Sequence, residues 1–276
     1  MQNWLITGCS TGIGQALALA VLEGGWNATL TARNPVELEH FSARFGTNRC
    51  LIQKLDVTDA SSIDAAVTRS EQQFGSIDVL VNNAGFGLRA AVEEADDEEL
   101  RELFDTNFFG LVRLTKAVLP GMRVRKNGFI VNMSSAAGRL AQAGNALYSA
   151  SKFAVEGMSD GLRKELQPLG IHVLLVEPGP FRTDFAGRSL RQSRIQIDDY
   201  AATAGILRKE NSRIHGNQPG DPARAAQCII RTLQHPTPPF RLVLGRVASE
   251  RVEAELKAQI RELSEWKGMA AEADFP

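Results

Sequence analysis

The chain has 276 residues, with 31 lysine and arginine residues against 32 aspartate and glutamate residues, a formal net charge of −1. That length suits one large α/β domain or two small domains and is ample to bury a core. The near-neutral charge argues against a protein that binds the phosphate backbone of nucleic acids, and no uninterrupted apolar run approaches the ~18 residues of a membrane span.

The start of the chain and its cysteines indicate a cytoplasmic protein. An apolar strand pattern begins almost at once, with no lysine or arginine before it, so we expect no secretory signal peptide. Cys9, Cys50 and Cys228 are odd in number and widely spaced, which speaks against a disulfide framework and is typical of a reducing compartment.

Short apolar runs alternate along the chain with longer stretches of helical spacing. Several runs are apolar at every position, as in strands that are covered on both faces. The alternation predicts an α/β fold, a single-domain Rossmann-like doubly wound parallel sheet of about seven strands with helices on both faces. The expected strands are 4–7, 28–32, 50–55, 79–82, 129–133, 172–177 and 241–244, and the expected helices lie near 13–24, 35–45, 60–74, 97–124, 147–167 and 221–234.

Two regions depart from this alternation. Residues 181–219 are rich in Arg, Ser, Gln, Asn and Gly without a strong strand pattern, and long irregular segments of this kind are usually functional lids or mobile loops. Residues 249–276 have the pattern of a charged amphipathic helix with a frayed acidic tail, for which we expect a role in surface packing. No linker divides the chain, so we expect one domain over residues 1–248, with 249–276 as its C-terminal helix and tail.

A glycine-rich turn follows the first expected strand, with the sequence Thr7-Gly8-Cys9-Ser10-Thr11-Gly12-Ile13-Gly14. Its three glycines allow a tight turn and a close approach of the backbone to a ligand. The helix that it opens presents free N–H groups and positive dipole charge to a diphosphate. The spacing is not the commoner G-x-G-x-x-G, and a glycine turn without a ligand remains the alternative.

The end of the second expected strand indicates which dinucleotide would bind. An acidic residue here would hold the ribose hydroxyls of NAD, whereas an arginine accommodates the extra phosphate of NADP. Arg33 occupies this place, and no aspartate or glutamate follows before Glu37. The sequence therefore predicts NADP, with a solvated surface arginine as the alternative for Arg33.

A serine, a tyrosine and a lysine form the candidate catalytic group. Ser135 follows the expected strand 129–133, and Tyr148 and Lys152 lie one helical turn apart at the start of the next helix. A tyrosine with a pKa near ~10 is a poor base unless a nearby cation favours the phenolate, and Lys152 supplies such a cation. Ser135 would polarise a substrate carbonyl while Tyr148 transfers the proton and a nicotinamide carries the hydride.

With these motifs the sequence resembles a single-domain short-chain dehydrogenase/reductase over about residues 3–184. It matches the TGxxxGxG turn, the segment Asn82-Asn83-Ala84-Gly85, the Ser–Tyr–Lys group and the PGxxxT stretch that meets the nicotinamide. The resemblance implies that Asn107 is a fourth catalytic residue, which bends its helix and holds a water in a proton relay, and that Asp56 lies beside the adenine. The expected cofactor-binding residues are Gly8, Ser10, Thr11, Gly12, Ile13, Gly14, Arg33, Asp56, Val57, Asn83, Ala84, Gly85, Tyr148, Lys152, Pro178, Gly179 and Thr183.

One departure from the family concerns the cofactor. Some NADP-preferring members carry a basic residue just before the second glycine, where this chain has Thr11, so the NADP preference rests on Arg33 with the Ser10 hydroxyl as a possible aid. The segments TGCSTGIG and YSASKFAVEG resemble the steroid and retinol dehydrogenase branch, which implies an apolar carbonyl or alcohol substrate. Specificity is expected to lie in the substrate loop, defined as residues 181–219.

The remaining features have simpler interpretations. The four histidines have no metal-ligand spacing, so no metal site is expected, and Cys9 is expected to be a small buried residue. A stripe of small residues indicates either close packing within the chain or a homodimer or homotetramer interface. Its members are Ala150, Ala154, Gly157 and Gly161. The main hypothesis is an NADP(H)-dependent oxidoreductase that interconverts carbonyl and alcohol. The rival hypothesis is a cofactor-binding protein without turnover.

Overall fold

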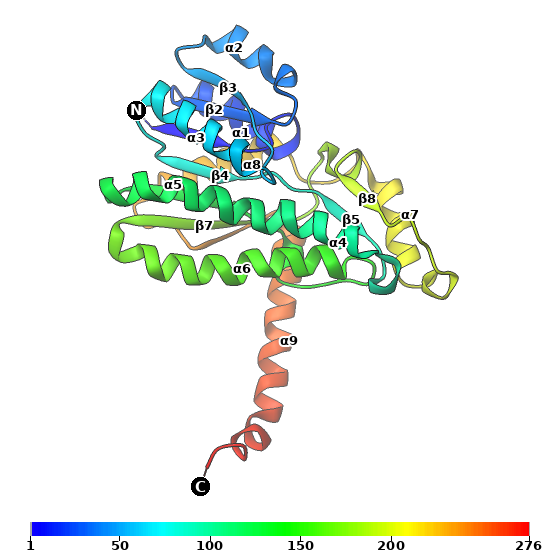
Figure 1. Cartoon of the computed structure of the whole chain (residues 1–276). Coiled ribbons are helices and arrows are strands. Elements are labelled where there is room, and N and C mark those ends of the chain that lie inside the picture. Colours follow the sequence, from blue (N-terminus) through cyan, green and yellow to red (C-terminus); the bar gives the residue numbers. More distant parts are fainter. Residues whose placement is uncertain (1, 276) are drawn as a thin grey trace.

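The computed structural model describes residues 2–275, except for the side chains of residues 211 and 212, and its centre is a seven-stranded parallel sheet (Figure 1). The strand order is β3-β2-β1-β4-β6-β7-β9, so that the chain winds outward in both directions from the β1–β4 pair. All seven expected strands are confirmed, most with ends shifted by one or two residues. They are β1 (Asn3–Ile6), β2 (Asn27–Ala32), β3 (Cys50–Lys54), β4 (Val79–Asn82), β6 (Gly128–Met133), β7 (Ile171–Pro178) and β9 (Arg241–Leu244).

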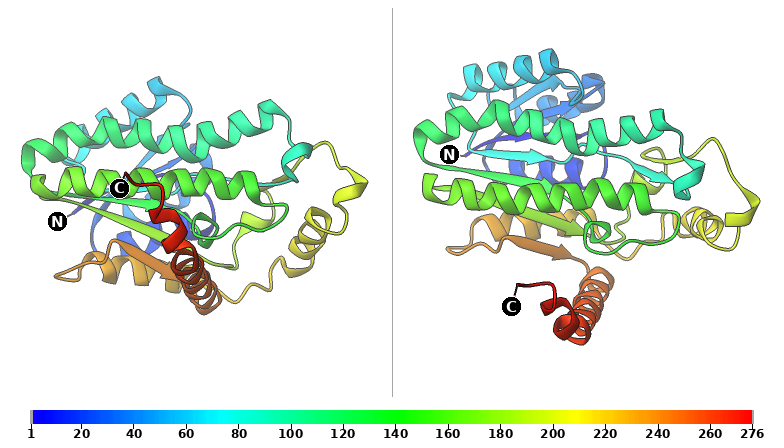
Figure 2. Two further views of the ribbon diagram at one scale, coloured as in Figure 1. Left: turned by 90° about the horizontal axis from the view of Figure 1, so that it is seen from below. Right: turned by 60° about the horizontal axis from the view of Figure 1, so that its bottom comes forward.

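Helices cover both faces of the sheet (Figure 2). The side chains of β1 alternate, with Trp4 and Ile6 in the core beneath one helical layer and Leu5 in the core beneath the other. This alternation is why an entirely apolar strand is stable here. The first layer is α1 (Gly12–Glu23), α2 (Glu39–Phe45) and α8 (Pro222–Leu233), and the second is α3 (Ala60–Phe74), α5 (Leu111–Arg125) and α6 (Ala146–Leu166).

The long helix expected near 97–124 is divided into three parts. It begins as α4 (Asp97–Phe104), where Asp96 accepts a hydrogen bond from the Glu99 amide in a capping box. It continues through a π-helical turn (Asp105–Gly110) into α5. A π turn inserts an extra residue and re-aims the side chains that it carries, Asn107 among them.

A second, small layer lies beyond the carboxyl ends of the sheet strands. Strands β5 (Gly87–Arg89) and β8 (Leu190–Gln192) pair in parallel, and helix α7 (Ala204–Ile214) lies beside them. None of these three elements was expected from the sequence. The substrate loop is therefore an ordered cover in the structure, because β8 and α7 both belong to it.

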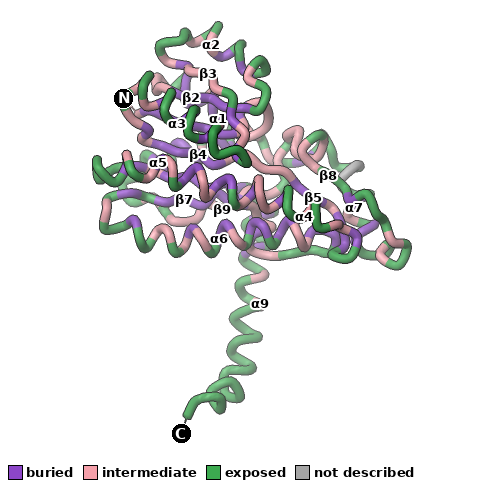
Figure 3. Tube along the Cα trace, in the orientation of Figure 1, coloured by how far each residue is buried: buried purple, intermediate pink, exposed green. Residues whose placement is uncertain are grey.

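Helix α9 (Arg246–Ala271) begins against β9 and then leaves the body of the molecule (Figure 3). Within this helix only Ala248 and Val252 are buried. The expected role in surface packing is wrong for the distal part, whose large apolar side chains are exposed. They are Leu256, Ile260, Leu263, Trp266 and Met269. No helix within residues 2–275 is both long and apolar enough to cross a lipid bilayer.

The small-residue stripe on α6 faces outward. Ala150, Gly157 and Gly161 are exposed, and a Cβ atom built on either glycine would have no neighbouring atom within 4 Å. Packing against another helix of the same chain, one of the two expectations for this stripe, is therefore excluded at the glycine positions.

Candidate active site

A cleft of about 680 Å³ opens where the carboxyl ends of β1 and β4 meet. This is the point at which the strand order reverses, and ligands of doubly wound sheets bind there. The Thr7 hydroxyl joins the two strand ends, since it accepts hydrogen bonds from the amides of Asn83 and Ala84, each at 2.9 Å. Every candidate site residue expected from the sequence lines the cleft except Gly14 and Asn107, which lie behind its wall.

The glycine turn forms the floor of the cleft and depends on its glycines. Gly8 and Gly12 have φ angles of +69° and +64°, which other residues rarely adopt. A Cβ on Gly14 would come within 2.4 Å of the Gly8 carbonyl oxygen and of Nδ2 of Asn83. That Nδ2 donates to the Thr7 carbonyl at 2.8 Å, so the Asn83 side chain stabilises the glycine turn.

The first turn of α1 is open to an anion. Thr11 occupies the N-cap position without a side-chain hydrogen bond to the helix, and no acidic residue lies in the first turn. The opposite side of the turn is closed by Thr183, whose Cβ would lie 3.4 Å from a Cβ on Gly12. Free amides, positive dipole charge and a narrow glycine floor together fit a diphosphate group.

Charged side chains surround the far end of the cleft, beyond β2 and β3. Arg33 is exposed directly after β2. Glu37 forms a 3.5 Å ion pair with Arg188 of the substrate loop, and Asp184 holds the same arginine at 2.9 Å. The Asp56 carboxylate accepts hydrogen bonds from Thr58. Arg33 therefore lines this end of the cleft, as expected, and the nearby Glu37 is paired with Arg188.

Tyr148 and Lys152 line the cleft together from the first turns of α6. Lys152 Nζ lies 5.8 Å from the centre of the Tyr148 ring and donates to the Met133 carbonyl at 2.8 Å. Both side chains are buried, and burial lowers the pKa of Lys152 to about 8. Ser135 lines the same part of the cleft and caps a short turn by accepting from the Ala137 amide at 3.1 Å. Ser135, Tyr148 and Lys152 thus line the same cleft.

The pKa of Tyr148 differs from the sequence expectation. Burial raises it, while a hydrogen bond from Ser135 and the positive charge of Arg89 offset part of the rise. The expected lowering by Lys152 is not found, because the lysine ammonium is turned to the Met133 carbonyl and desolvation dominates. A protonated phenol at neutral pH is a proton donor, which is the form that carbonyl reduction requires.

Asn107 holds the wall behind the cleft. Its side-chain oxygen accepts from the Phe86 amide at 3.0 Å, and its nitrogen donates to the Phe86 carbonyl at 2.9 Å and to the Ser151 hydroxyl at 3.2 Å. The π turn directs the side chain to these partners, which ties the loop after β4 to α6 beside Lys152. The side chain is buried, so this asparagine is not a solvated helix residue.

The comparison with known proteins agrees with this arrangement. The sequence profile of short chain dehydrogenases matches residues 2–194. The chain belongs to the short-chain dehydrogenase family. It is 38% identical to the 3-ketodihydrosphingosine reductase of Bacteroides thetaiotaomicron (88% of both chains) and 34% identical to retinol dehydrogenase 8 of Homo sapiens (86% of this chain, 79% of the relative).

Solved structures of the family share the fold of this short-chain dehydrogenase. A short-chain dehydrogenase from Streptomyces avermitilis matches with a TM-score of 0.93 and 40% identity over 99% of this chain and 100% of that one. A serine dehydrogenase complexed with NADP⁺ matches with a TM-score of 0.76 and 27% identity over 88% and 94%. The protein is therefore an oxidoreductase of a family that uses NAD(P).

Two charged groups of this short-chain dehydrogenase were missed by sequence reasoning. Arg89 lines the cleft near Tyr148, and the only signal for it was an arginine within the apolar segment 86–92. Glu177 is fully buried at the end of β7, paired with Arg139 at 3.2 Å and Arg241 at 3.3 Å. Burial raises the pKa of Glu177 to about 7. An arginine on a distant strand gives no sequence signal for such a pair.

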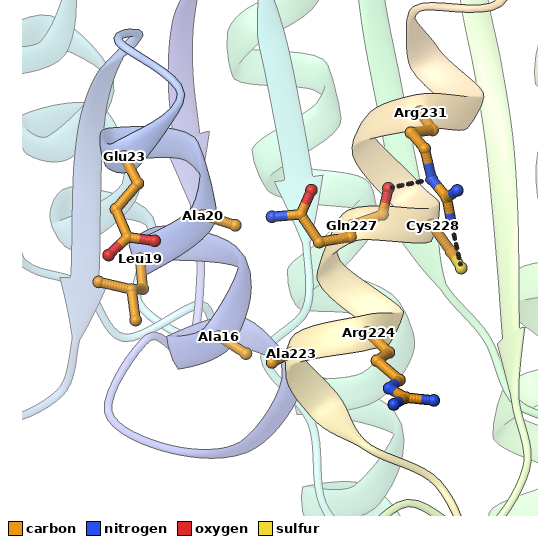
Figure 4. A pocket seen from close by; sticks show the side chains of 9 residues that line it. All are labelled: Ala16, Leu19, Ala20, Glu23, Ala223, Arg224, Gln227, Cys228 and Arg231. Carbon is orange, nitrogen blue, oxygen red and sulfur yellow. Dashed lines mark hydrogen bonds between the residues drawn. The ribbon is translucent and has the colours of Figure 1, made fainter.

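The structure also bears on possible metal ligands, on the Cys9 thiol and on a second cavity. Within the part of the chain that the structure describes, no three His, Cys, Asp or Glu side chains gather as metal ligands. Cys9 is fully buried, and burial raises the pKa of its thiol to about 12, so it is an inert packing residue. A second cavity, of about 400 Å³, lies between α1 and α8 beside Cys228, and none of the residues that line it is a candidate site residue (Figure 4).

Proposed function

We propose that this short-chain dehydrogenase interconverts a carbonyl and an alcohol with NADP(H), acting on a largely apolar small molecule. The observation that carries the proposal is the placement of Tyr148, Lys152 and Ser135 in the cleft whose floor is the glycine turn. The residues present fit the cofactor, since the turn and the open first turn of α1 form an anion cradle. When bound, the nicotinamide supplies or accepts the hydride.

Each catalytic side chain has a proposed task. Ser135 donates a hydrogen bond to the substrate oxygen, and Tyr148 gives it a proton in reduction or removes one in oxidation. Lys152, which lines the cleft beside Tyr148, would hold the nicotinamide ribose. Asn107 fixes the loop after β4 against α6 and so supports the proton path at Lys152.

The remaining proposed cofactor contacts follow the cleft from end to end. The diphosphate would be held by Gly8, Ser10, Thr11, Gly12 and Ile13, which line the cleft, with Gly14 and Asn83 supporting the turn. Asp56 and Val57 would hold the adenine, Ala84 and Gly85 the middle of the cofactor, and Pro178, Gly179 and Thr183 the nicotinamide.

Two observations support an apolar substrate. Phe86, Phe181 and Phe185 line the cleft, and the Phe185 ring lies 5.9 Å from the Tyr148 ring. The relatives named above act on 3-ketodihydrosphingosine and retinol, both largely hydrocarbon. The three free thiols agree with a proposed cytoplasmic setting.

A binding protein without turnover is the alternative, and a simple assay separates the two. Loss of NADPH absorbance with members of a panel of ketones and aldehydes supports the enzyme. Binding of NADPH without any consumption across carbonyl and alcohol panels would support the alternative. All four catalytic positions carry the expected residue types, which favours the enzyme.

Replacing Arg33 by aspartate is expected to shift cofactor preference from NADP toward NAD. A guanidinium after β2 attracts the 2′-phosphate of NADP, whereas a carboxylate repels it and binds the ribose hydroxyls. The measurement is the ratio of kcat/KM for NADPH to that for NADH, in which we expect a fall of about 10²-fold, two charge-assisted contacts being involved. Arg69→Asp, on the exposed surface of α3, is the matched control. An unchanged ratio in Arg33→Asp would contradict the assignment.

We propose that the exposed stripe on α6 forms the interface of a homodimer or homotetramer. Small side chains permit close approach of a second helix, and soluble homo-oligomers are commonly symmetric. Gly157→Arg is expected to convert the protein to monomers while the fold persists, because the position is open within the chain and arginine favours a helix. Sedimentation equilibrium measures this, with Gly268→Arg on α9 as control, and a monomeric parent protein would refute the interface.

A further inference from the structure

We propose that Arg89 binds a carboxylate of the substrate, so that the substrate class is an apolar carbonyl or alcohol compound that also carries a carboxylate group. This inference rests on the proposed function, because it concerns the substrate of the same site. Three observations support it: Arg89 lines the cleft near Tyr148, its guanidinium has no carboxylate partner among the described residues, and it contacts the N-cap residue of α6.

Arg89 is the last residue of β5 and lines the cleft together with Tyr148, Ser135 and Lys152. Its charge acts on the Tyr148 phenol, whose pKa it lowers. The side chain is half-buried, and burial lowers the pKa of the guanidinium. An arginine nevertheless stays protonated at neutral pH. The part of the cleft near Tyr148 thus contains a permanent positive charge next to the proposed proton donor.

This charge has no counter-ion among the described residues. No carboxylate of residues 2–275 forms an ion pair with Arg89, in contrast to Arg191, which also lines the cleft and pairs with Glu102. Of the carboxylates that line the cleft, Glu37 and Asp56 lie at the other end, and Glu210 is exposed on α7 and makes no ion pair with Arg89. Charges that lose water contact are ordinarily paired, so an unpaired one in a cleft is a candidate for ligand recognition.

The N-terminus of α6 adds to the positive potential. Asn145, the N-cap residue, makes no side-chain hydrogen bond to its own helix, and its amide oxygen instead accepts from Nη1 of Arg89. The first turn of this 21-residue helix contains no acidic residue. A guanidinium fixed at the positive end of a helix dipole is unfavourable for the protein alone and favourable once an anion lies between them.

The free edge of the guanidinium suits a carboxylate. Nη1 is used by Asn145, whereas Nε and Nη2 have no acceptor among the residues described, and Nε is buried without a partner. Nε and Nη2 share one edge, which takes the two oxygens of a carboxylate in a fork. Because Nε is covered, the second bond of the fork requires a small movement of Arg89, while Nη2 offers the first.

Binding of octanoate, measured by isothermal titration calorimetry, tests the anion site without turnover. We expect octanoate to bind at least about 10-fold more tightly than octanamide, which has the same chain without the charge. Arg89→Met is expected to weaken octanoate binding by about 10- to 100-fold and to leave octanamide unchanged, since a charge-assisted hydrogen bond has this effect. Arg89→Lys, which keeps the charge but not the fork, should show an intermediate loss. Thermal melts establish that each variant is folded.

The matched substrates 4-oxooctanoate and 4-octanone test the same residue in the reaction, because they differ by the carboxylate alone. With NADPH, Arg89→Met should raise KM for 4-oxooctanoate by about 10- to 100-fold and leave kcat/KM for 4-octanone within about 3-fold. An equal fall in kcat for both, with a shifted pH profile, would overturn the proposal and make Arg89 a positioning residue for Tyr148. Arg191→Met is the control, and an equal loss of octanoate affinity there would reduce the site to general positive charge and also overturn it.

The proposed function and the proposed carboxylate site can fail independently of each other. If the protein consumes NADPH with neither substrate nor with the wider panel, the proposed function fails, while Arg89-dependent octanoate binding would still establish the anion site. If it reduces 4-octanone as well as 4-oxooctanoate and octanoate binds no better than octanamide, the function stands and the carboxylate proposal fails.

Discussion

Replacing Tyr148 by phenylalanine is expected to lower kcat by about 10³-fold and to leave NADPH affinity nearly unchanged. The phenol oxygen is the proposed proton donor, and loss of a positioned general acid typically has an effect of this size. The ring itself is retained, so its contacts with Phe185 and Lys152 persist and the cleft keeps its shape. Steady-state kinetics with a reducible ketone and fluorescence titration with NADPH measure the two quantities.

The chain supplies its own control, because Tyr200 is its other tyrosine. That side chain donates to Glu93 at 2.6 Å and does not line the cleft. Tyr200→Phe should retain the parental kcat. If Tyr148→Phe turned over at a near-parental rate, the proposed mechanism would have to be abandoned, whatever the cofactor affinity.

The elevated pKa of Tyr148 predicts how the rates of reduction and oxidation depend on pH. Burial favours the protonated phenol, so in reduction the acid is present through neutral pH and is lost as pH rises through that elevated pKa. Oxidation needs the phenolate and should therefore increase as pH rises. This differs from the sequence expectation, which counted the charge of Lys152 and did not count the desolvation of both groups.

Local signals account for most of the sheet. The strands were predictable because both faces are covered, so Leu5 and Leu80 are as apolar as their neighbours Trp4 and Val81 and each strand stands out as a continuous run. The three-residue strands β5 and β8 lacked any such signal, since their pairing is set by the cover over the cleft rather than by their own pattern.

The predicted packing of the distal half of α9 was wrong for a different reason. Leu256, Ile260 and Leu263 recur at helical spacing, which predicts the helix correctly and predicts a partner surface as well. In the structure that surface is exposed, because spacing reports that a side of the helix is apolar but not which element covers it.

The residues of the site likewise fall into those that local sequence patterns predict and those that they do not. Ser135, Tyr148 and Lys152 could be placed from spacing along one strand and one helix, and the glycine turn from its position after β1. Arg89 acts on Tyr148, and Glu177 pairs with Arg241, across elements that are remote in sequence, and no pattern near either residue indicates its partner. Contacts between distant elements have no periodicity, so sequence alone predicts them least well.

A buried ion pair helps to anchor the cover over the cleft, and replacing Glu94 by alanine is expected to lower the free energy of unfolding by about 3 kcal/mol. Glu94 is fully buried and binds Arg208 of α7 through both carboxylate oxygens. The same carboxylate accepts from the Ile197 amide at 3.0 Å and the Ala91 amide at 2.7 Å. One side chain thus joins the segment after β5 to two parts of the substrate loop.

The effect should depend on pH in a defined direction. The hydrogen bonds from Arg208 hold the pKa of Glu94 at about 2, well below its ordinary value of 4.5. A carboxyl with a lowered folded-state pKa stabilises the fold above pH 4.5, and that contribution is lost as pH falls from 4.5 toward 2. The stability difference between the parent protein and Glu94→Ala should therefore be constant at neutral pH and shrink over this acid range.

Urea denaturation at pH 7 and pH 3 measures the difference, and hydrogen exchange of α7 shows where it acts. Faster exchange confined to residues 190–214 would mean that the cover detaches while the sheet stays folded, and a larger KM for substrate should accompany it. Glu98→Ala, which removes an exposed carboxylate paired with Arg194, is the matched control and should change little. Equal stability losses in the two variants would mean that Glu94 does not anchor the cover.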